Sequence, residues 1–399
     1  MQAQVTEELK PDDVANHYAT HLAEVNNTQE VLTTEDIRAQ NGMMLVKKGT
    51  RVTPEVAQRI LMHKLLKPIE SQVKLANSLN PAALNQHFEQ LFNKYTDLNT
   101  VNQTYAFEKK LGSLLQKISL NPILYQKLTV LSQQLPEVYE KALFCAWLCA
   151  LIASEQPLTE KDIHNAFIAG LFHDIGLLHI DPTVLFKETE LSPDEWRAIQ
   201  SHVVIGYLIF KGSDIANQEV ARAILEHHEC CDGTGYPKAK TAEQLLILGQ
   251  ILAQADSIQA IRINRFKDNG RTMRDALPIL HMNSGSHFLT VYKTICLIIL
   301  KSKLPVYSGN PYPDFATLIN TLIERVDKLQ DAIVVLMLIR DLTTTEQTNS
   351  QYFRYLEVID PVIFMIRSSG LVRDELTVWL KKLRLNEDGR SSQVRSPAA

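Results

Sequence analysis

The 399-residue sequence lacks the features that mark several large classes of protein. Its five cysteines form no paired disulfide framework, which favours a reducing compartment. The net charge of -4 gives no case for a basic face that binds long nucleic acid. The most apolar run, residues 142–153, is too short to cross a bilayer, and no glycine-rich phosphate loop is present. We therefore expect a cytoplasmic protein that neither spans a membrane nor binds long nucleic acid.

The N-terminus and the composition agree with this expectation. Residues 1–8 have neither the basic start nor the apolar core of a signal peptide. Hydrophobic residues make up 45% of the chain and charged residues 22%, and the length suffices for two or three domains with proper cores. Cys145 and Cys149 lie one helical turn apart in the apolar run, so we interpret them as core residues rather than ligands.

One stretch, residues 173–237, concentrates side chains that bind metals. It passes His202 and contains two longer motifs, His173-Asp174-Ile175-Gly176 and His227-His228-Glu229 followed by Asp232-Gly233-Thr234-Gly235-Tyr236-Pro237. Neutral imidazole and carboxylate together suit divalent ions such as iron, manganese or zinc. Because an adjacent His and Asp at a helix end can both reach one ion, the pattern favours a metal site over scattered polar residues.

These two motifs resemble the HD-GYP branch of the HD phosphohydrolases, over roughly residues 131–300. The resemblance implies an all-helical HD-superfamily domain that hydrolyses cyclic di-GMP, a bacterial second messenger, with divalent metal ions. We therefore expect a mainly α protein, in which this domain lies between a small mixed α/β N-terminal module and a helical C-terminal extension.

The patterns along the chain predict five parts. These are an N-terminal module (1–75), a helical connector (76–130), the HD-GYP domain (131–304), the helical extension (305–386) and a disordered tail (387–399). Within the module, residues up to 27 are interpreted as a frayed or partly helical arm. Strands are expected at 43–46 and near 69–75, on either side of a helix that Thr53 caps.

Local signals predict where the helices of the central domain begin and end. Capping residues are expected at Thr159, Ser192 and Asn217. Gly176 is interpreted as a helix stop. Both glycines of Gly233-Thr234-Gly235 are expected to adopt positive φ in a rigid loop beside the site.

The resemblance also implies roles for individual residues. The implied metal ligands come from separate segments: Glu137, His173, Asp174, His202, His227, His228 and Asp256. Asp174 is expected to be catalytic and to bridge two ions in metal-assisted hydrolysis of a phosphodiester. Arg265 matches a catalytic contact to the substrate phosphate, although a solvated helix-end arginine is an equal alternative. Gly233 and Tyr236 are expected to shape the substrate-binding loop.

Several positions depart from the family pattern. Lys141 stands where the family has a histidine ligand, and an ammonium has no lone pair to offer a metal. It is instead able to take the place of one cation. Leu177 replaces a lysine that contacts phosphate, and Cys230 stands where arginine is usual. These departures predict fewer bound ions and weakened activity.

Three functions stay open at this point. They are an active cyclic di-GMP phosphodiesterase with a reduced metal centre, a degenerate relative that binds nucleotide or protein without turnover, and a phosphohydrolase of another nucleotide. The expected cofactors are one or two divalent ions, with iron or manganese favoured. A homodimer stays open too, as does contact of the Gly-Tyr-Pro loop with a diguanylate cyclase or another signalling protein.

Overall fold

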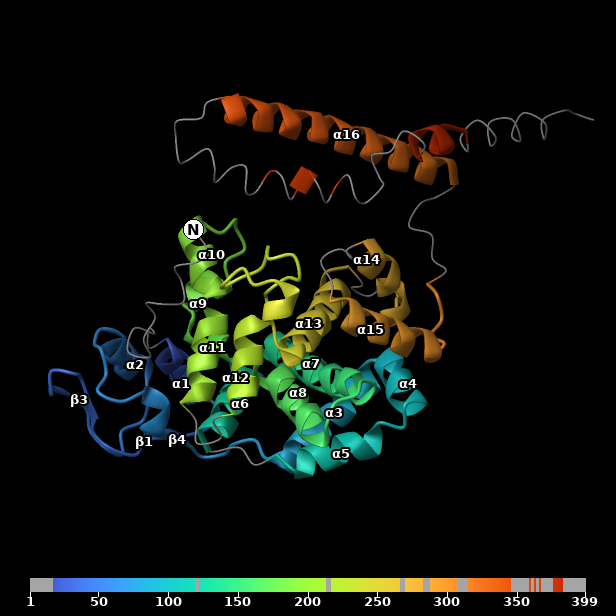
Figure 1. Cartoon of the computed structure of the whole chain (residues 1–399). Coiled ribbons are helices and arrows are strands. Elements are labelled where there is room, and N and C mark those ends of the chain that lie inside the picture. The colour runs from blue at the N-terminus through green and yellow to red at the C-terminus, as the bar shows by residue number, and fades with distance from the viewer. Residues whose placement is uncertain are drawn as a thin grey trace, which may run out of the picture. The chain divides into compact units, whose positions relative to one another are not determined.

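Helices dominate the structure, a computed structural model in which two compact units are distinguished, Met1–Val306 and Tyr307–Ala399. The residues described are 17–118, 122–212, 217–265, 270–282, 288–307, 315–345, 359, 362, 363, 366 and 376–382. Among them, the strands are two short antiparallel pairs near the N-terminus (Figure 1). The expected mainly α fold is confirmed. The five-part division stays a prediction, since the first unit is not subdivided further.

The N-terminal module combines two short helices with both strand pairs. Its elements are α1 (Tyr18–Val25), β1 (Val31–Thr33), β2 (Ile37–Arg38), β3 (Met44–Val46), α2 (Pro54–Leu61), η2 (Ile69–Ser71) and β4 (Val73–Leu75). Strand β1 pairs with β4, and β2 pairs with β3. Helix α2 begins as predicted, because the Thr53 side chain accepts a hydrogen bond from the Val56 backbone N–H.

Helix α1 agrees with the partly helical alternative for residues up to 27, but it is packed rather than frayed. Tyr18, Leu22 and Val25 are fully buried, and the helix packs against α2 and α6. These residues are spaced by four and three positions, which places all three side chains on one helix face. Polar residues between them make this pattern hard to recognise in the sequence.

A helical bundle forms the rest of the first unit. Its elements are α3 (Pro81–Lys94), α4 (Thr96–Thr104), α5 (Glu108–Gln116), α6 (Pro122–Gln134), α7 (Pro136–Ser154), α8 (Glu160–Phe172), η3 (Ile175–His179), α9 (Pro182–Leu185), α10 (Pro193–Gln200), α11 (His202–Lys211), α12 (Gln218–Glu226), η4 (Ala242–Gln244), α13 (Ile247–Arg265), η5 (Met273–Ala276), α14 (Leu277–Met282) and α15 (Leu289–Lys301). Capping residues begin three of these helices as predicted. Thr159 and Ser192 form complete capping boxes, and the Asn217 side chain accepts from the Glu219 backbone.

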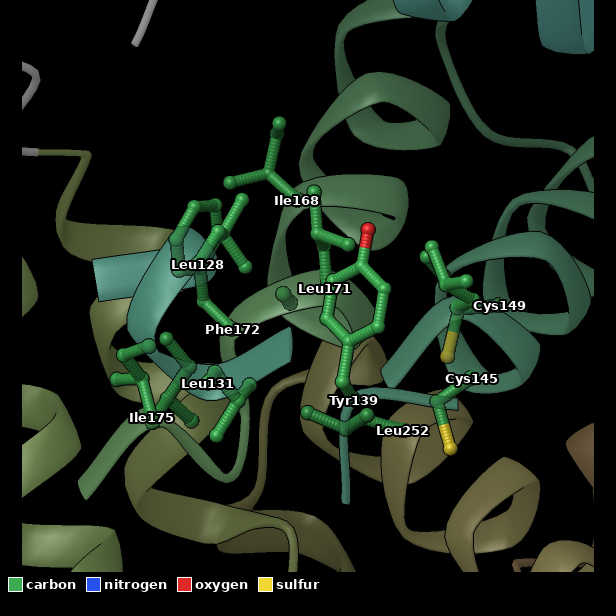
Figure 2. Close-up of a cluster of buried hydrophobic side chains, with 14 of the residues drawn as sticks. Leu128, Leu131, Tyr139, Cys145, Cys149, Ile168, Leu171, Phe172, Ile175 and Leu252 are labelled. Atoms are coloured by element: carbon green, nitrogen blue, oxygen red, sulfur yellow. The ribbon is translucent and has the colours of Figure 1, made fainter. Parts of the chain in front are cut away.

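Helices α7 and α8 form the centre of this bundle. Figure 2 shows Leu171 and Phe172 of α8 in one apolar cluster with Leu128 of α6 and Leu252 of α13. Gly170 permits the close approach, because a Cβ there would lie 2.6 Å from the backbone of Cys145 and Ala146 on α7. A rigid α7–α8 pair therefore supports the residues that follow α8.

Gly176 has a different role from the helix stop that we expected. It lies within η3 rather than at a positive-φ terminus. A Cβ at this position would lie 2.1 Å from the backbone oxygen of His202 on α11. The glycine is needed because two backbone segments pack together here, and both carry candidate metal ligands.

The second unit contains one long helix, α16 (Phe315–Thr345). Ile319, Ile323 and Val326 of this helix form a small core with Leu380. The predicted tail at 387–399 lies outside the described residues. In the parts of the chain that the structure describes, no helix combines the length and apolar character needed to cross a membrane.

Candidate metal centre

The end of α8 delivers the first two candidate ligands into the interior. His173 is the C-terminal cap residue of α8, and Asp174 precedes η3. Their side chains are 0% and 3% exposed. His202 begins α11, His227 and His228 follow α12, and Asp256 lies within α13. Four separate segments thus meet at one buried point.

Three histidines are each held by a backbone oxygen at the end of the preceding helical turn. The Nδ1 atoms of His173, His202 and His227 lie 2.7 to 2.8 Å from the backbone oxygens of Gly170, Ile199 and Ile224, each three residues earlier. A carbonyl oxygen only accepts, so each Nδ1 carries the hydrogen. In the neutral ring, the Nε2 atom therefore has a lone pair to offer, as metal-binding histidines require.

These Nε2 atoms converge on the Asp174 carboxylate. The Nε2 atoms of His202 and His227 lie 3.3 and 3.7 Å from Asp174 Oδ1, and 3.5 Å from each other. Asp174, His202, His227 and His228 each offer a ligand atom within 4.8 Å of the others. We call these four residues the first donor set.

A second donor set lies on the other side of Asp174. It consists of Cys145, His173 and Asp256, whose ligand atoms also lie within 4.8 Å of one another. His173 Nε2 lies 3.1 Å from Asp174 Oδ2 and 3.6 Å from Asp256 Oδ1. The Lys141 ammonium contacts the same two oxygens, at 2.9 and 2.7 Å. Lys141 is thus paired with both carboxylates and does not point to solvent.

The charged groups in and beside the second donor set stabilise one another. Burial would raise the pKa values of Asp174 and Asp256, but His173 and Lys141 hold them well below the usual range. Burial likewise disfavours the Lys141 ammonium, yet the two carboxylates raise its pKa well above the ordinary value. Asp174 outweighs the effect of burial on His173 and raises the pKa of that ring to about 9.

Two histidines of the first donor set are instead disfavoured as cations. Burial lowers the pKa of His227, and burial together with His227 holds the pKa of His228 well below its usual range. These rings are therefore neutral, and His227 Nε2 faces a carboxylate oxygen with its lone pair. Such an arrangement is repulsive unless a cation lies between the donors. Three imidazoles and one carboxylate fit a divalent transition metal.

The Gly-Tyr-Pro loop packs directly on this set. The Tyr236 ring stacks on His228 at 4.7 Å, and its backbone N–H donates to the His228 oxygen. The Glu229 carboxylate accepts from the backbone N–H groups of Lys238 and Lys240, which fixes the loop beyond Pro237. Buried Glu229 thus has a structural role, which the motif alone did not indicate.

The two loop glycines differ in their roles. Gly233 has φ +78°, as expected. Gly235 does not adopt positive φ, which corrects the prediction. A Cβ at Gly235 would lie 2.4 Å from the Cys230 backbone nitrogen, so close packing requires the glycine there.

Six of the seven predicted ligands are brought together, and the seventh is not. Glu137 is exposed in the first turn of α7 and belongs to neither donor set. The Arg265 side chain lies outside the described residues. Cys145, which we interpreted as core, is fully buried but also belongs to the second donor set. Its position four residues after Lys141 on α7 is the signal that could have identified it.

Comparison with known proteins agrees with this geometry. The HD domain family matches residues 119–288. A cyclic di-GMP phosphodiesterase of Thermotoga maritima is 32% identical over 140 residues, which cover 35% of this chain and 38% of that protein. A cyclic di-GMP phosphodiesterase response regulator of Xanthomonas campestris pv. campestris is 32% identical, with the same coverage of both chains. A 3'3'-cGAMP-specific phosphodiesterase of Vibrio cholerae is 31% identical over 33% of this chain and 29% of its own length.

The chain spans less than two fifths of the length of these relatives. The segment that matches the HD domain family contains both donor sets together with the His-Asp and Gly-Tyr-Pro motifs. Residues 119–288 therefore form an HD domain of the HD-GYP type.

Proposed function

We propose that this protein is a metal-dependent phosphodiesterase that hydrolyses a cyclic dinucleotide, with cyclic di-GMP as its substrate. The observation that carries the proposal is the convergence of three imidazoles and Asp174 within 4.8 Å. The relatives are named as phosphodiesterases of cyclic di-GMP and of 3'3'-cGAMP, and both names support a cyclic dinucleotide.

Some of the proposed site residues would hold the ion, and others would shape its surroundings. Asp174 Oδ1, the Nε2 atoms of His202 and His227, and a ring nitrogen of His228 would hold the ion. When bound, a divalent ion supplies Lewis-acid activation of water and neutralises charge on the phosphate. Mixed nitrogen and oxygen donors suit iron or manganese, which we propose as the cofactor. Tyr236 keeps the His228 ring in place by stacking on it.

A second candidate function is favoured by Lys141. Its ammonium contacts Asp174 and Asp256, so an ion in the second donor set would have to compete with it for both carboxylates. A centre without a second ion supports binding of a cyclic dinucleotide as a regulatory signal without turnover. In that case the Gly-Tyr-Pro loop would remain a surface for a signalling partner.

Turnover by the full chain separates these candidates. The protein is loaded with Mn²⁺ or, without oxygen, with Fe²⁺, and products from cyclic di-GMP and 3'3'-cGAMP are separated by chromatography. We expect hydrolysis by the wild type and none by Asp174→Asn. His164→Ala is the matched control, because this histidine lies earlier on α8 and outside both donor sets.

One result would count against the proposal. The phosphodiesterase function fails if wild type and Asp174→Asn both leave the two cyclic dinucleotides intact. Calorimetric binding of cyclic di-GMP to that inactive protein would then support the regulatory function instead.

A further inference from the structure

Asp174 directs its two oxygens toward different surroundings. Oδ1 faces His202 and His227 of the first donor set. Oδ2 faces His173 and the Lys141 ammonium. The carboxylate is therefore positioned to be shared between two cations, one on each side.

The cation beside Asp174 Oδ2 is the side-chain ammonium of Lys141. Lys141 Nζ lies 2.9 Å from Asp174 Oδ2 and 2.7 Å from Asp256 Oδ1. A transition-metal ion bound to both oxygens would lie about 2.0 to 2.2 Å from each of them. An ion bound to both oxygens would therefore have to compete with the ammonium for the same two carboxylates.

We infer that the Lys141 ammonium is the permanent cation of the second donor set, and that the chain binds one divalent ion, in the first donor set. This inference rests on the proposed metal dependence of the site but not on turnover. It assigns Lys141 a positioning role, in which it holds Asp174 and Asp256 where a second ion would otherwise hold them.

Burial keeps Lys141 in this position. Its side chain is 20% exposed, and those of Asp174 and Asp256 are 3% and 10% exposed. If the ammonium turned to solvent, two buried carboxylates would lose their shared partner, which is strongly unfavourable. The ammonium also repels a divalent ion at the same place, whereas the first donor set contains no lysine or arginine.

The number and place of bound ions test the inference directly. Equilibrium dialysis of the full chain against Mn²⁺, followed by elemental analysis, should give one ion per wild-type chain. The electron paramagnetic resonance spectrum should be that of an isolated ion. Lys141→His removes the ammonium and adds a lone pair, so it should bind two ions and give the spectrum of a coupled pair.

Two further variants locate the single ion of the wild type. His228→Gln should lose the ion, whereas Cys145→Ser in the second donor set should retain it with an affinity within about twofold of wild type. Two ions in the wild type would overturn the inference, and so would an ion that is lost in Cys145→Ser but kept in His228→Gln. These measurements need no substrate, so one ion without turnover would contradict the proposed function and leave this inference intact.

Discussion

The close packing between Gly176 and α11 leads to a sharp prediction, because only backbone atoms are involved. In Gly176→Ala, the new Cβ would lie 2.1 Å from the His202 backbone oxygen and 2.9 Å from the Gly206 nitrogen. Unbonded carbon and oxygen atoms approach to about 3.3 Å. The start of α11 must therefore retreat from η3 by about 1 Å, since no side-chain rotation relieves the contact.

This displacement should affect stability and metal binding together. Overpacking of this kind costs about 1–3 kcal/mol in free energy of unfolding. His202 Nε2 lies 3.3 Å from Asp174 Oδ1, and metal sites tolerate changes of only about 0.2 Å in ligand distance. We expect Mn²⁺ affinity to fall by about 10- to 100-fold, as it does when the support of a ligand is disturbed.

Thermal unfolding and Mn²⁺ titration of the purified variant measure both effects. Gly112→Ala is the matched control, because a Cβ at Gly112 on α5 meets no atom within 4 Å. Alanine there should raise stability by about 0.5–1 kcal/mol and leave metal affinity unchanged. If Gly176→Ala unfolds like wild type and binds Mn²⁺ equally well, η3 and α11 do not pack as closely as we describe.

Three further predictions concern charges and the ion. Glu70→Gln leaves the fully buried Lys127 ammonium without its carboxylate and should lower the free energy of unfolding by about 3–5 kcal/mol. Adding Lys127→Met should restore most of this loss in a double-mutant cycle measured by urea unfolding. Burial raises the pKa of Glu70, but Lys127 and His179 outweigh it and hold this pKa at about 2. The stabilisation from the ionised Glu70 carboxylate is thus fully present above the unfolded pKa of about 4.3 and is lost toward pH 2. Acid should therefore destabilise wild type more than Glu70→Gln. Mn²⁺ at a hundred times its Kd should raise the free energy of unfolding by about 2.7 kcal/mol, and this gain should disappear with chelator or in His228→Ala.

Features that depend on neighbours in sequence were predicted well. The cap residues of α2, α8, α10 and α12 are Thr53, Thr159, Ser192 and Asn217, as expected. Each works through a hydrogen bond to a backbone N–H two or three residues later, so a short window of sequence contains all the information. The mainly α fold was expected from the family resemblance, and these local signals agree with it.

Features that depend on distant segments were predicted less well. Gly176 and Gly235 permit close contact between backbone segments, which has no local signature. We assigned Gly176 to a helix stop and Gly235 to a positive-φ loop. Glu137 and Lys141 lie one turn apart on α7, and the resemblance placed both at ligand positions. Only the register of α7 against α8 and α13 determines that Lys141 enters the site while Glu137 remains exposed.

The contacts of Lys127 also argue against treating residues 131–304 as a self-sufficient domain. Its ammonium on α6 lies 3.1 Å from Glu70 on η2 and 2.8 Å from His179 on η3, and it lies over the ring of Tyr18 on α1. The η3 segment begins directly after Asp174, the carboxylate shared by both sides of the candidate metal centre. A chain that begins at residue 131 would lose Tyr18, Glu70 and Lys127, so His179 would lose the Tyr18 ring that stacks on it at 5.4 Å and the Lys127 ammonium. The N-terminal module is thus part of the support for Asp174, and the catalytic proposal applies to the first unit as a whole.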